Sequence, residues 1–252
     1  MTGTEAQSGQ VGVRHEGAVA VLELQRADKR NALNTSMCDA IREAVEEAAG
    51  GGARAVVITG AGTAFCAGAD LSGDVYSSRF PLALVHMLHT IEQVRVPVIA
   101  AVNGPAIGAG TQLALACDLR VVDEGARFQI PVVKVGLAVH NWTVRKLTEM
   151  VGGGHARTML LGAQLMDSGQ AGTLGLANRI GDVAAAREWA AELAGYAPLS
   201  LQHLKMVFND DGGRSKASDE QTELFNKVWA SEDKSEASRA RREGRAPRFQ
   251  GV

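Results

Sequence analysis

Two stretches rich in glycine and alanine are the clearest candidates for a chemical site. The first, FCAGADL, covers residues 65–71, and the second, NGPAIGAGTQLALACD, covers residues 103–118. Each follows an apolar run of strand length, and the second opens an apolar helical stretch. Small residues let a ligand approach the backbone, and the first turn of a helix leaves N–H groups unpaired with a partial positive charge. Two such turns facing each other would polarise a carbonyl oxygen, as an oxyanion hole does. Close packing of strand and helix without a ligand is an equal alternative.

Histidines and other motifs offer few further sites. His140, in GLAVHNW, titrates in a useful range, and both proton transfer and the shaping of a pocket are open to it. His86 and His89 lie three residues apart on an apolar helical stretch, but the sequence offers no third ligand. The run TGAGTAF follows a strand as a dinucleotide-binding turn does, yet Phe65 replaces the last glycine such a turn needs. The sequence therefore predicts neither a metal site nor a dinucleotide cofactor.

Alternating strand and helix patterns position these turns. Residues 11–25 alternate apolar and polar around Glu16 and Gly17, which predicts a hairpin, and a helix follows from Asn34 or Thr35 to the glycines at 50–52. The later predicted elements are strands at 54–59, 97–102, 119–123 and 176–181, and helices at 80–94, 108–117, 183–193, 199–208 and within 218–245, with a polar linker at 209–220. This order predicts an α/β fold with mostly parallel strand pairing and a helical C-terminal region.

Composition excludes several classes of protein. The 252 residues carry 26 lysines and arginines against 28 aspartates and glutamates, without a basic stripe for nucleic acid. Three cysteines, Cys38, Cys66 and Cys117, are odd in number and lie in apolar sequence, which predicts reduced core thiols. No apolar run is long enough for a membrane span, and the polar start lacks the order of a signal peptide. We expect a soluble cytoplasmic protein with no nucleic-acid partner and no membrane insertion.

Several motifs occur together, in order and at suitable spacing. They are RADKRNALN, GTAFCAGADL, PVIAAVNGPAIGAGTQLALACDLRVV, ARFQIPVVKVGL and the closing RRE…PRFQG. From about Val11 to the C-terminus, the chain resembles the enoyl-CoA hydratase/isomerase family, the crotonases. The resemblance implies a crotonase (ClpP-like) spiral of ββα units and a homotrimer or hexamer that binds acyl thioesters of coenzyme A, with no other cofactor. The implied domains are a polar tail at 1–10, a spiral core at 11–195 and a helical trimerisation region at 196–252.

The resemblance also assigns roles to individual residues. The oxyanion donors would be the backbone N–H groups of Ala69 and Ala109, and Ala109 stands where the family usually has glycine. The residues implied to lie against coenzyme A are Lys29, Arg30, Ala32, Ala67, Gly68, Ala69, Asp70 and Leu71. The residues implied to line an acyl pocket are Phe80, Leu84, Met87, Leu88, Ile91 and Trp142. Alternatives remain for these roles. Lys29 and Arg30 could lie in a solvated loop, and the apolar residues of the predicted helix 80–94 could simply belong to the core. Asp70 fits a structural role in capping backbone amides.

The chain departs from the family pattern at both acid/base positions. Where the family's hydratases carry two glutamates, this sequence has Gln112 and Val132. Glutamine can hydrogen-bond a water but cannot take its proton, and valine can do neither. The favoured hypothesis is a non-hydratase acyl-CoA binder or carrier in fatty-acid or lipid metabolism. The alternative is an active enzyme, either a slow hydratase or isomerase or one that uses His140 for another acyl-CoA reaction.

Overall fold

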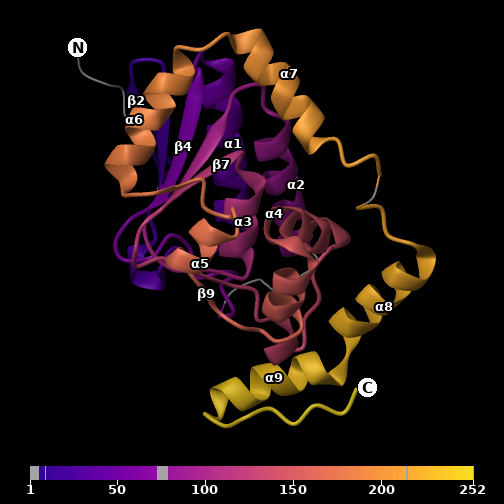
Figure 1. Cartoon of the computed structure of the whole chain (residues 1–252). Helices are drawn as coiled ribbons and strands as arrows, with labels where there is room; N and C mark the ends of the chain where they lie inside the picture. Colours follow the sequence, from indigo (N-terminus) through magenta and orange to yellow (C-terminus); the bar gives the residue numbers. More distant parts are fainter. Residues whose placement is uncertain (1–5, 9, 73–78, 214, 252) are drawn as a thin grey trace. The chain divides into compact units, whose positions relative to one another are not determined.

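The computed structural model describes residues 6–8, 10–72, 79–213 and 215–251. Helices and strands alternate up to residue 129, and helices prevail after it (Figure 1). The strands are β1 (Ala6–Ser8), β2 (Val11–Glu16), β3 (Val19–Leu24), β4 (Ala55–Gly60), β5 (Val98–Val102), β6 (Ala106–Ile107), β7 (Leu119–Val122), β8 (Arg127–Gln129), β9 (Met166–Asp167) and β10 (Arg179–Ile180). The helices are α1 (Thr35–Gly50), α2 (Arg79–Gln93), α3 (Ala109–Ala116), α4 (Asn141–Leu160), α5 (Ser168–Thr173), α6 (Val183–Ala194), α7 (Pro198–Asn209), α8 (Asp219–Ala230) and α9 (Glu232–Arg242).

The larger sheet contains seven strands in the order β1-β2-β3-β4-β5-β7-β10. β2 and β3 form the predicted hairpin, with Glu16 paired to Val19. From β3 to β10 all neighbours are parallel, so the prediction of an α/β fold with mostly parallel pairing is confirmed. β1 pairs antiparallel with β2, which extends the sheet into the stretch predicted as a tail. β6, β8 and β9 form a separate small sheet.

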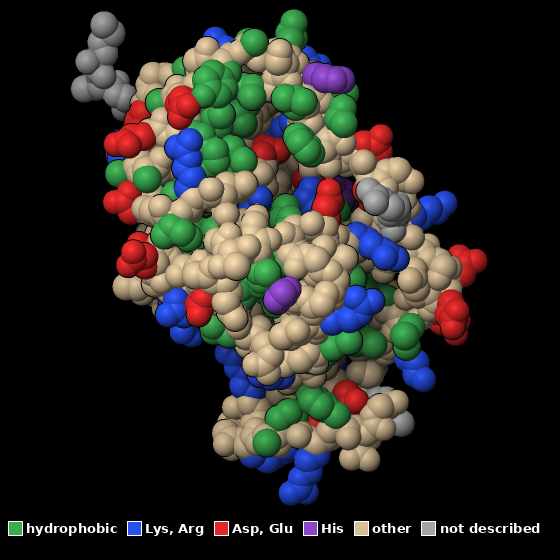
Figure 2. All heavy atoms as spheres, in the orientation of Figure 1, with side chains coloured by type: hydrophobic (Ala, Val, Ile, Leu, Met, Phe, Trp, Pro, Cys, Tyr) green, Lys and Arg blue, Asp and Glu red, His purple; other side chains and the backbone are tan. Residues whose placement is uncertain are grey.

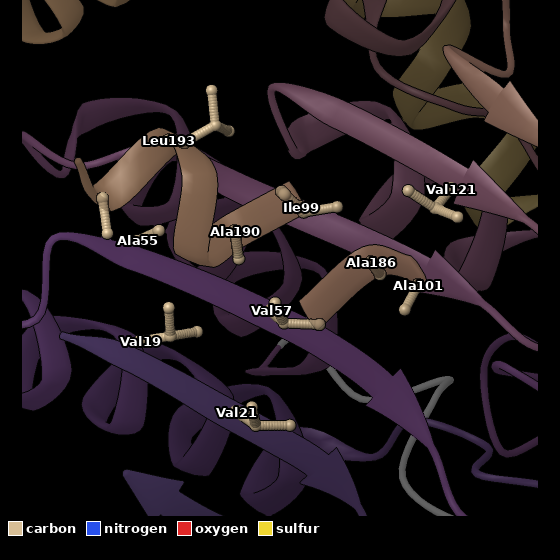
Figure 3. Packing of buried hydrophobic residues seen from close by; sticks show 11 residues of the cluster. Val19, Val21, Ala55, Val57, Ile99, Ala101, Val121, Ala186, Ala190 and Leu193 are labelled. Atoms are coloured by element: carbon tan, nitrogen blue, oxygen red, sulfur yellow. The ribbon is translucent and has the colours of Figure 1, made fainter. Parts of the chain in front are cut away.

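Both faces of the central strands β4 and β5 are buried. On one face, alternate strand residues such as Val57 and Ala101 pack against Ala186 and Ala190 of α6 (Figure 3). The residues between them, such as Ile58, point to the opposite face, the side of α1, and are also buried. Burial on both faces explains why these strands read as continuous apolar runs.

Helix α1 begins and ends where the sequence predicts. The side chain of Asn34 accepts a hydrogen bond from the Met37 N–H at 2.9 Å, which satisfies one of the unpaired donors of the first turn. The helix stops at Gly50, two residues before Gly52, whose φ of 94° is the left-handed conformation that glycine adopts at helix ends.

Two buried cations tie separate segments together. The guanidinium of Arg120 donates to the carbonyl oxygens of Cys117 at 2.7 Å and Leu176 at 2.6 Å, so it joins the end of α3 to the segment before β10. The ammonium of Lys205 on α7 donates to the Ile91 carbonyl and to the Asp118 carboxylate, each at 2.8 Å. Because a buried charge is costly unless it is fully hydrogen-bonded, these residues fix the segments they join.

The chain forms two compact units. The first contains residues 1–128 and 166–210, and the second contains residues 129–165 and 211–252. In the second unit the predicted helical segment 218–245 forms α8 and α9, which are separated at Ser231, a residue with extended backbone whose hydroxyl caps α9. The domain boundaries at residues 10/11 and 195/196 stay a prediction.

Two expectations from composition concern cysteines and membranes. All three cysteines are free and buried, as predicted. Burial raises the pKa of the Cys66 and Cys117 thiols to about 12, so neither supplies a thiolate nucleophile at neutral pH. Among the described residues, no helix is both long and apolar enough to cross a membrane.

Candidate functional site

The two small-residue turns lie side by side in the first unit. Cys66 and Ala106 form a parallel bridge between them. The Cys66 N–H donates to the Pro105 carbonyl at 3.1 Å, and the Ile107 N–H donates to the Cys66 carbonyl at 2.9 Å. Turns that are far apart in the sequence are therefore joined by backbone hydrogen bonds.

Glycines allow the two backbones to touch. A Cβ on Gly104 would lie 2.3 Å from the Thr63 carbonyl oxygen, and a Cβ on Gly110 would lie 2.2 Å from the Cys66 carbonyl oxygen. Real Cβ atoms do not approach a carbonyl oxygen so closely, so any larger residue would push the turns apart. The small residues at these positions thus serve close packing of one turn on the other.

The N–H of Ala69 points away from the hydrogen bonds that hold its turn. The Leu33 N–H donates to the Gly68 carbonyl at 2.7 Å, and the Asp70 N–H donates to the Leu33 carbonyl at 2.7 Å. In a planar trans peptide the C=O and the following N–H point in opposite directions. The Ala69 N–H is therefore directed away from Leu33, and among the described residues it has no acceptor.

The N–H of Ala109 is the first donor of α3. The Gly108 carbonyl accepts the Gln112 N–H at 3.1 Å, so the N–H on the other side of that peptide points out from the start of the helix. No acceptor for it occurs in the described part of the chain. The Ala109 nitrogen lies 3.7 Å from where a Cβ on Gly68 would be, which places this donor beside the peptide that carries the Ala69 donor.

Gln112 and Val132 stand at the two positions where the family's hydratases carry glutamate, and they belong to different units. Gln112 is 7% exposed and follows Ala109 by three residues on α3, on the same side of the helix. Val132 begins a short 3₁₀ helix in the second unit and is half-buried. Neither position carries a carboxylate.

His140 packs against an aromatic ring in the second unit. Its imidazole is exposed, and its centroid lies 4.6 Å from that of Phe225 on α8 at an interplanar angle of 34°. The next residue, Asn141, donates to the side-chain oxygen of Gln221 on the same helix at 3.0 Å. Trp142 follows and is half-buried. The start of α4 is thus tied to α8, and proton transfer by His140 stays a prediction.

The loop before Leu33 holds the first turn from outside. Lys29 and Arg30 have exposed side chains, while Ala32 is buried. The Arg30 carbonyl accepts the Ala67 N–H at 2.9 Å. The backbone of Arg30 therefore fixes the turn, while its guanidinium remains in solvent.

Asp70 joins the end of the first turn to two neighbours. Its carboxylate accepts from the hydroxyl of Ser72 at 2.6 Å, from the Ser72 N–H at 3.1 Å and from the guanidinium of Arg26 at 2.9 Å. The Ser72 hydroxyl, with Arg26 second, lowers the pKa of Asp70 from 3.8 to about 2. Asp70 is thus ionised at neutral pH and holds the backbone beyond the turn. Leu71, between them, is half-buried.

The apolar stripe of α2 is part of the first unit's core. Its buried residues include Phe80, Leu84, Met87, Leu88 and Ile91, each at most 8% exposed. The helix packs against α1, α3 and α7. Trp142 belongs to the second unit, so an acyl pocket formed by all six residues stays a prediction. On the exposed side of α2, His86 and His89 join no cluster of possible metal ligands among the described residues.

A match to a known family model shows which family this chain belongs to. Residues 14–252 match the family model described as enoyl-CoA hydratase/isomerase. The chain belongs to the enoyl-CoA hydratase/isomerase family. The resemblance found in the motifs is therefore confirmed at the level of the family.

Several members of the family are similar over nearly the whole chain. The probable enoyl-CoA hydratase echA6 of Mycobacterium tuberculosis is 50% identical over 242 residues, which are 96% of this chain and all of that protein. The putative enoyl-CoA hydratase of Thermus thermophilus is 37% identical and covers 93% of this chain, with 98% of its own length matched. The enoyl-CoA hydratase/isomerase structure from Pseudoalteromonas atlantica is 29% identical over 96% of this chain and all of its own, with a TM-score of 0.85. A methylmalonyl-CoA decarboxylase structure, 22% identical with a TM-score of 0.89 over 98% of this chain and all of its own, shares the fold. The expected crotonase fold is therefore confirmed.

The amino-acid sequence alone assigned no role to two residues that hold the first small-residue turn. Arg26 pairs with Asp70, and Asn31 is a fully buried amide between the first turn and the loop before it. The only signal for Asn31 was its residue type, because asparagine tolerates left-handed backbone better than most residues. Its amide nitrogen donates to backbone carbonyls 30 and 33 residues away, which no local pattern identifies.

Proposed function

We propose that this protein binds acyl-CoA thioesters and holds the thioester carbonyl oxygen at the N–H groups of Ala69 and Ala109. The observation that carries the proposal is a pair of donors on two adjoining turns, neither of which has an acceptor in the described part of the chain. Preorganised backbone donors stabilise a polarised carbonyl, and more so as negative charge develops on its oxygen. Relatives named as enoyl-CoA hydratases support a thioester of coenzyme A as the ligand.

The remaining parts of the ligand are assigned to the neighbouring segments. The exposed cations Lys29 and Arg30 suit the phosphates of coenzyme A. Ala32 and residues 67–71 would lie along the pantetheine. The acyl chain would follow the apolar side of α2 with Trp142, and this requires the stripe to part from its present packing. Coenzyme A enters as part of the ligand, and no separate cofactor is proposed.

The residues at the acid/base positions favour binding over hydration. Adding water to an enoyl thioester needs one group that takes a proton from water and another that delivers a proton to carbon. The amide of Gln112 can orient a water without taking its proton, and Val132 can do neither. We therefore assign the protein to fatty-acid or lipid metabolism as an acyl-CoA binder or carrier, assembled as a homotrimer or a dimer of trimers.

One observation favours a second candidate function. The imidazole of His140 is exposed at the start of α4 and is held by Phe225, which would give a proton-transferring group a fixed orientation. The alternative is therefore an enzyme of the same family, either a slow hydratase or isomerase or one that uses His140 for another acyl-CoA reaction.

A single protein preparation distinguishes the two functions. Calorimetric titration with acyl-CoAs of several chain lengths measures binding, and the absorbance of an enoyl-CoA measures turnover. We expect binding with little or no hydration. The variant Gln112→Glu/Val132→Glu, which returns both carboxylates, is expected to raise the hydration rate by roughly 100-fold or more.

The outcomes separate the candidates clearly. Hydration by the wild-type protein at ordinary enzyme rates would contradict the binder assignment. Turnover that disappears in His140→Ala while acyl-CoA binding persists would establish the alternative enzyme. Failure to bind any acyl-CoA would overturn both.

A further inference from the structure

Asn31 is a polar residue with no exposed surface and with every side-chain polar group engaged. Its carbonyl oxygen accepts the Arg26 N–H at 3.0 Å, and its amide nitrogen donates to the carbonyl oxygens of Ala61 at 2.9 Å and Ala64 at 2.8 Å. One side chain thus joins the loop at 26–31 to the loop that leads into the first small-residue turn. A buried amide in such a place is costly unless all its bonds are made.

The backbone at this point has an unusual conformation. Arg30 and Asn31 have φ angles of 50° and 56°, two consecutive left-handed residues without glycine. The Asn31 N–H donates to the Arg26 carbonyl at 2.8 Å, which closes the loop on itself. Gly60 leaves room for the amide, because a Cβ there would lie 2.7 Å from its nitrogen. The surrounding structure is therefore shaped around this side chain.

The residues on either side of Asn31 hold the first turn. Arg30 accepts the Ala67 N–H, and Leu33 binds both Gly68 and Asp70. The bond from the Leu33 N–H to the Gly68 carbonyl is the one that directs the Ala69 N–H outward, because both groups belong to one planar peptide. A shift of the loop at Asn31 would rotate this peptide and turn the donor.

We propose that Asn31 is a positioning residue, which sets the direction of the Ala69 N–H through its neighbours Arg30 and Leu33. This inference rests on the proposed recognition of a thioester carbonyl at that donor. Asn31 itself does not touch the ligand. Its effect falls on the interaction with the carbonyl oxygen rather than on contacts with the nucleotide or the acyl chain.

Two variants remove the side-chain bonds in different ways. Asn31→Asp keeps the size and the tolerance of left-handed backbone, but it sets a carboxylate oxygen against two carbonyl oxygens. Asn31→Gly keeps the backbone freedom and removes the side chain altogether. Asn209→Asp is the matched control, since the Asn209 amide donates to the Glu92 carbonyl at 3.0 Å, at the end of α7 rather than at the turns.

The measurement isolates the carbonyl interaction. Each protein is titrated calorimetrically with an acyl-CoA and with the thioether analogue of the same chain length, which lacks the carbonyl oxygen. The ratio of the two dissociation constants reports the donors, whereas general damage to the fold weakens both ligands alike. We expect the wild-type preference for the thioester to fall roughly three- to tenfold in both Asn31 variants and to be unchanged in Asn209→Asp.

Each outcome has a distinct meaning. An unchanged ratio in Asn31→Gly, with the protein folded by circular dichroism, overturns the positioning role and leaves the proposed function intact. A wild-type ratio near one overturns the proposed thioester recognition itself. Should Asn31→Asp fail to fold, Asn31→Gly decides the question, and the shift of the bound thioester's carbonyl stretching frequency gives a second readout of the donor.

Discussion

At the scale of single residues, two peptide planes define the candidate site. Gly68 and Gly108 each have a carbonyl that is used in a structural hydrogen bond, and each is followed by an alanine whose N–H must then point the other way. Both donors are therefore backbone groups, and their directions are set by the hydrogen bonds of the preceding carbonyls. The glycines nearby serve a different purpose, because Gly104 and Gly110 let the two backbones meet.

Asp70 gives a prediction about pH. Its pKa is about 2 in the folded protein and ordinarily 3.8, so its stabilising contribution is complete above about pH 4 and is lost as the pH falls through about 2. We expect Asp70→Asn to lower the free energy of unfolding by about 1–2 kcal/mol near neutral pH, because it removes a charge that is hydrogen-bonded to Ser72 and Arg26 on a side chain only 11% exposed. Urea unfolding from about pH 6 to about pH 2 measures the difference, which should shrink on acidification.

A second variant tests the stated cause. Since the Ser72 hydroxyl contributes most to the lowered pKa, Ser72→Ala should reduce the pH dependence while leaving the ion pair with Arg26 in place. A difference between wild type and Asp70→Asn that stays constant over the whole pH range would show that the carboxylate is not stabilised as described.

At the scale of elements, the site depends on how closely α3 approaches the first small-residue turn, residues 65–71. Gly110 is the second residue of α3 and lies against the Cys66 carbonyl of that turn. Gly110→Ala would place a Cβ 2.2 Å from that oxygen, so the helix must move away from the turn. We expect a loss of about 3 kcal/mol in the free energy of unfolding, with weaker acyl-CoA binding. Urea unfolding and calorimetry measure the two effects.

The chain offers a matched control for this change. Gly50 ends α1 in the same unit, and a Cβ on it would meet no atom within 4 Å. Gly50→Ala should therefore alter the free energy of unfolding by no more than about 0.5 kcal/mol. Equal stability of the Gly110 and Gly50 variants would mean that the close approach of α3 is not required.

At the scale of the whole molecule, the surface of α7 bears on the proposed assembly. Hydrophobic side chains gather over α6 and α7 (Figure 2), and Leu199, Val207 and Phe208 are 78%, 59% and 73% exposed. Lys205 and Asn209 bond this helix to the rest of the first unit, while Leu199, Leu204, Met206, Val207 and Phe208 are exposed. An exposed apolar face of this kind is typical of an interaction surface.

The proposed homo-oligomer makes a simple prediction. Light scattering after gel filtration should give about three or six times the chain mass of 26.5 kDa. Val207→Glu/Phe208→Glu should lower that mass if α7 faces a second copy, because it would bury two charges at the contact. Leu82→Glu, at an exposed leucine of α2, is the control. A wild-type mass of one chain would contradict the proposal.

The sequence alone predicted the main strands of the larger sheet, most of the long helices, the mostly parallel pairing and the family, but it gave no range for α4 or for the strands of the small sheet. It succeeded where the features depend on local patterns: the apolar runs of buried strands, the cap at Asn34 and the small residues of the two turns. It also located both turns and offered Ala69 and Ala109 as donors, through the resemblance. It could not choose between close packing and ligand approach at the glycines.

Only the tertiary structure decided how the turns are held. The bonds from Asn31 to Ala61 and Ala64, and the pair of Arg26 with Asp70, join segments about thirty or more residues apart. Such contacts depend on where the chain returns in space, which no local periodicity encodes. The direction of a backbone N–H likewise follows from the partner of the carbonyl in the same peptide, so it is known only once that partner is in place.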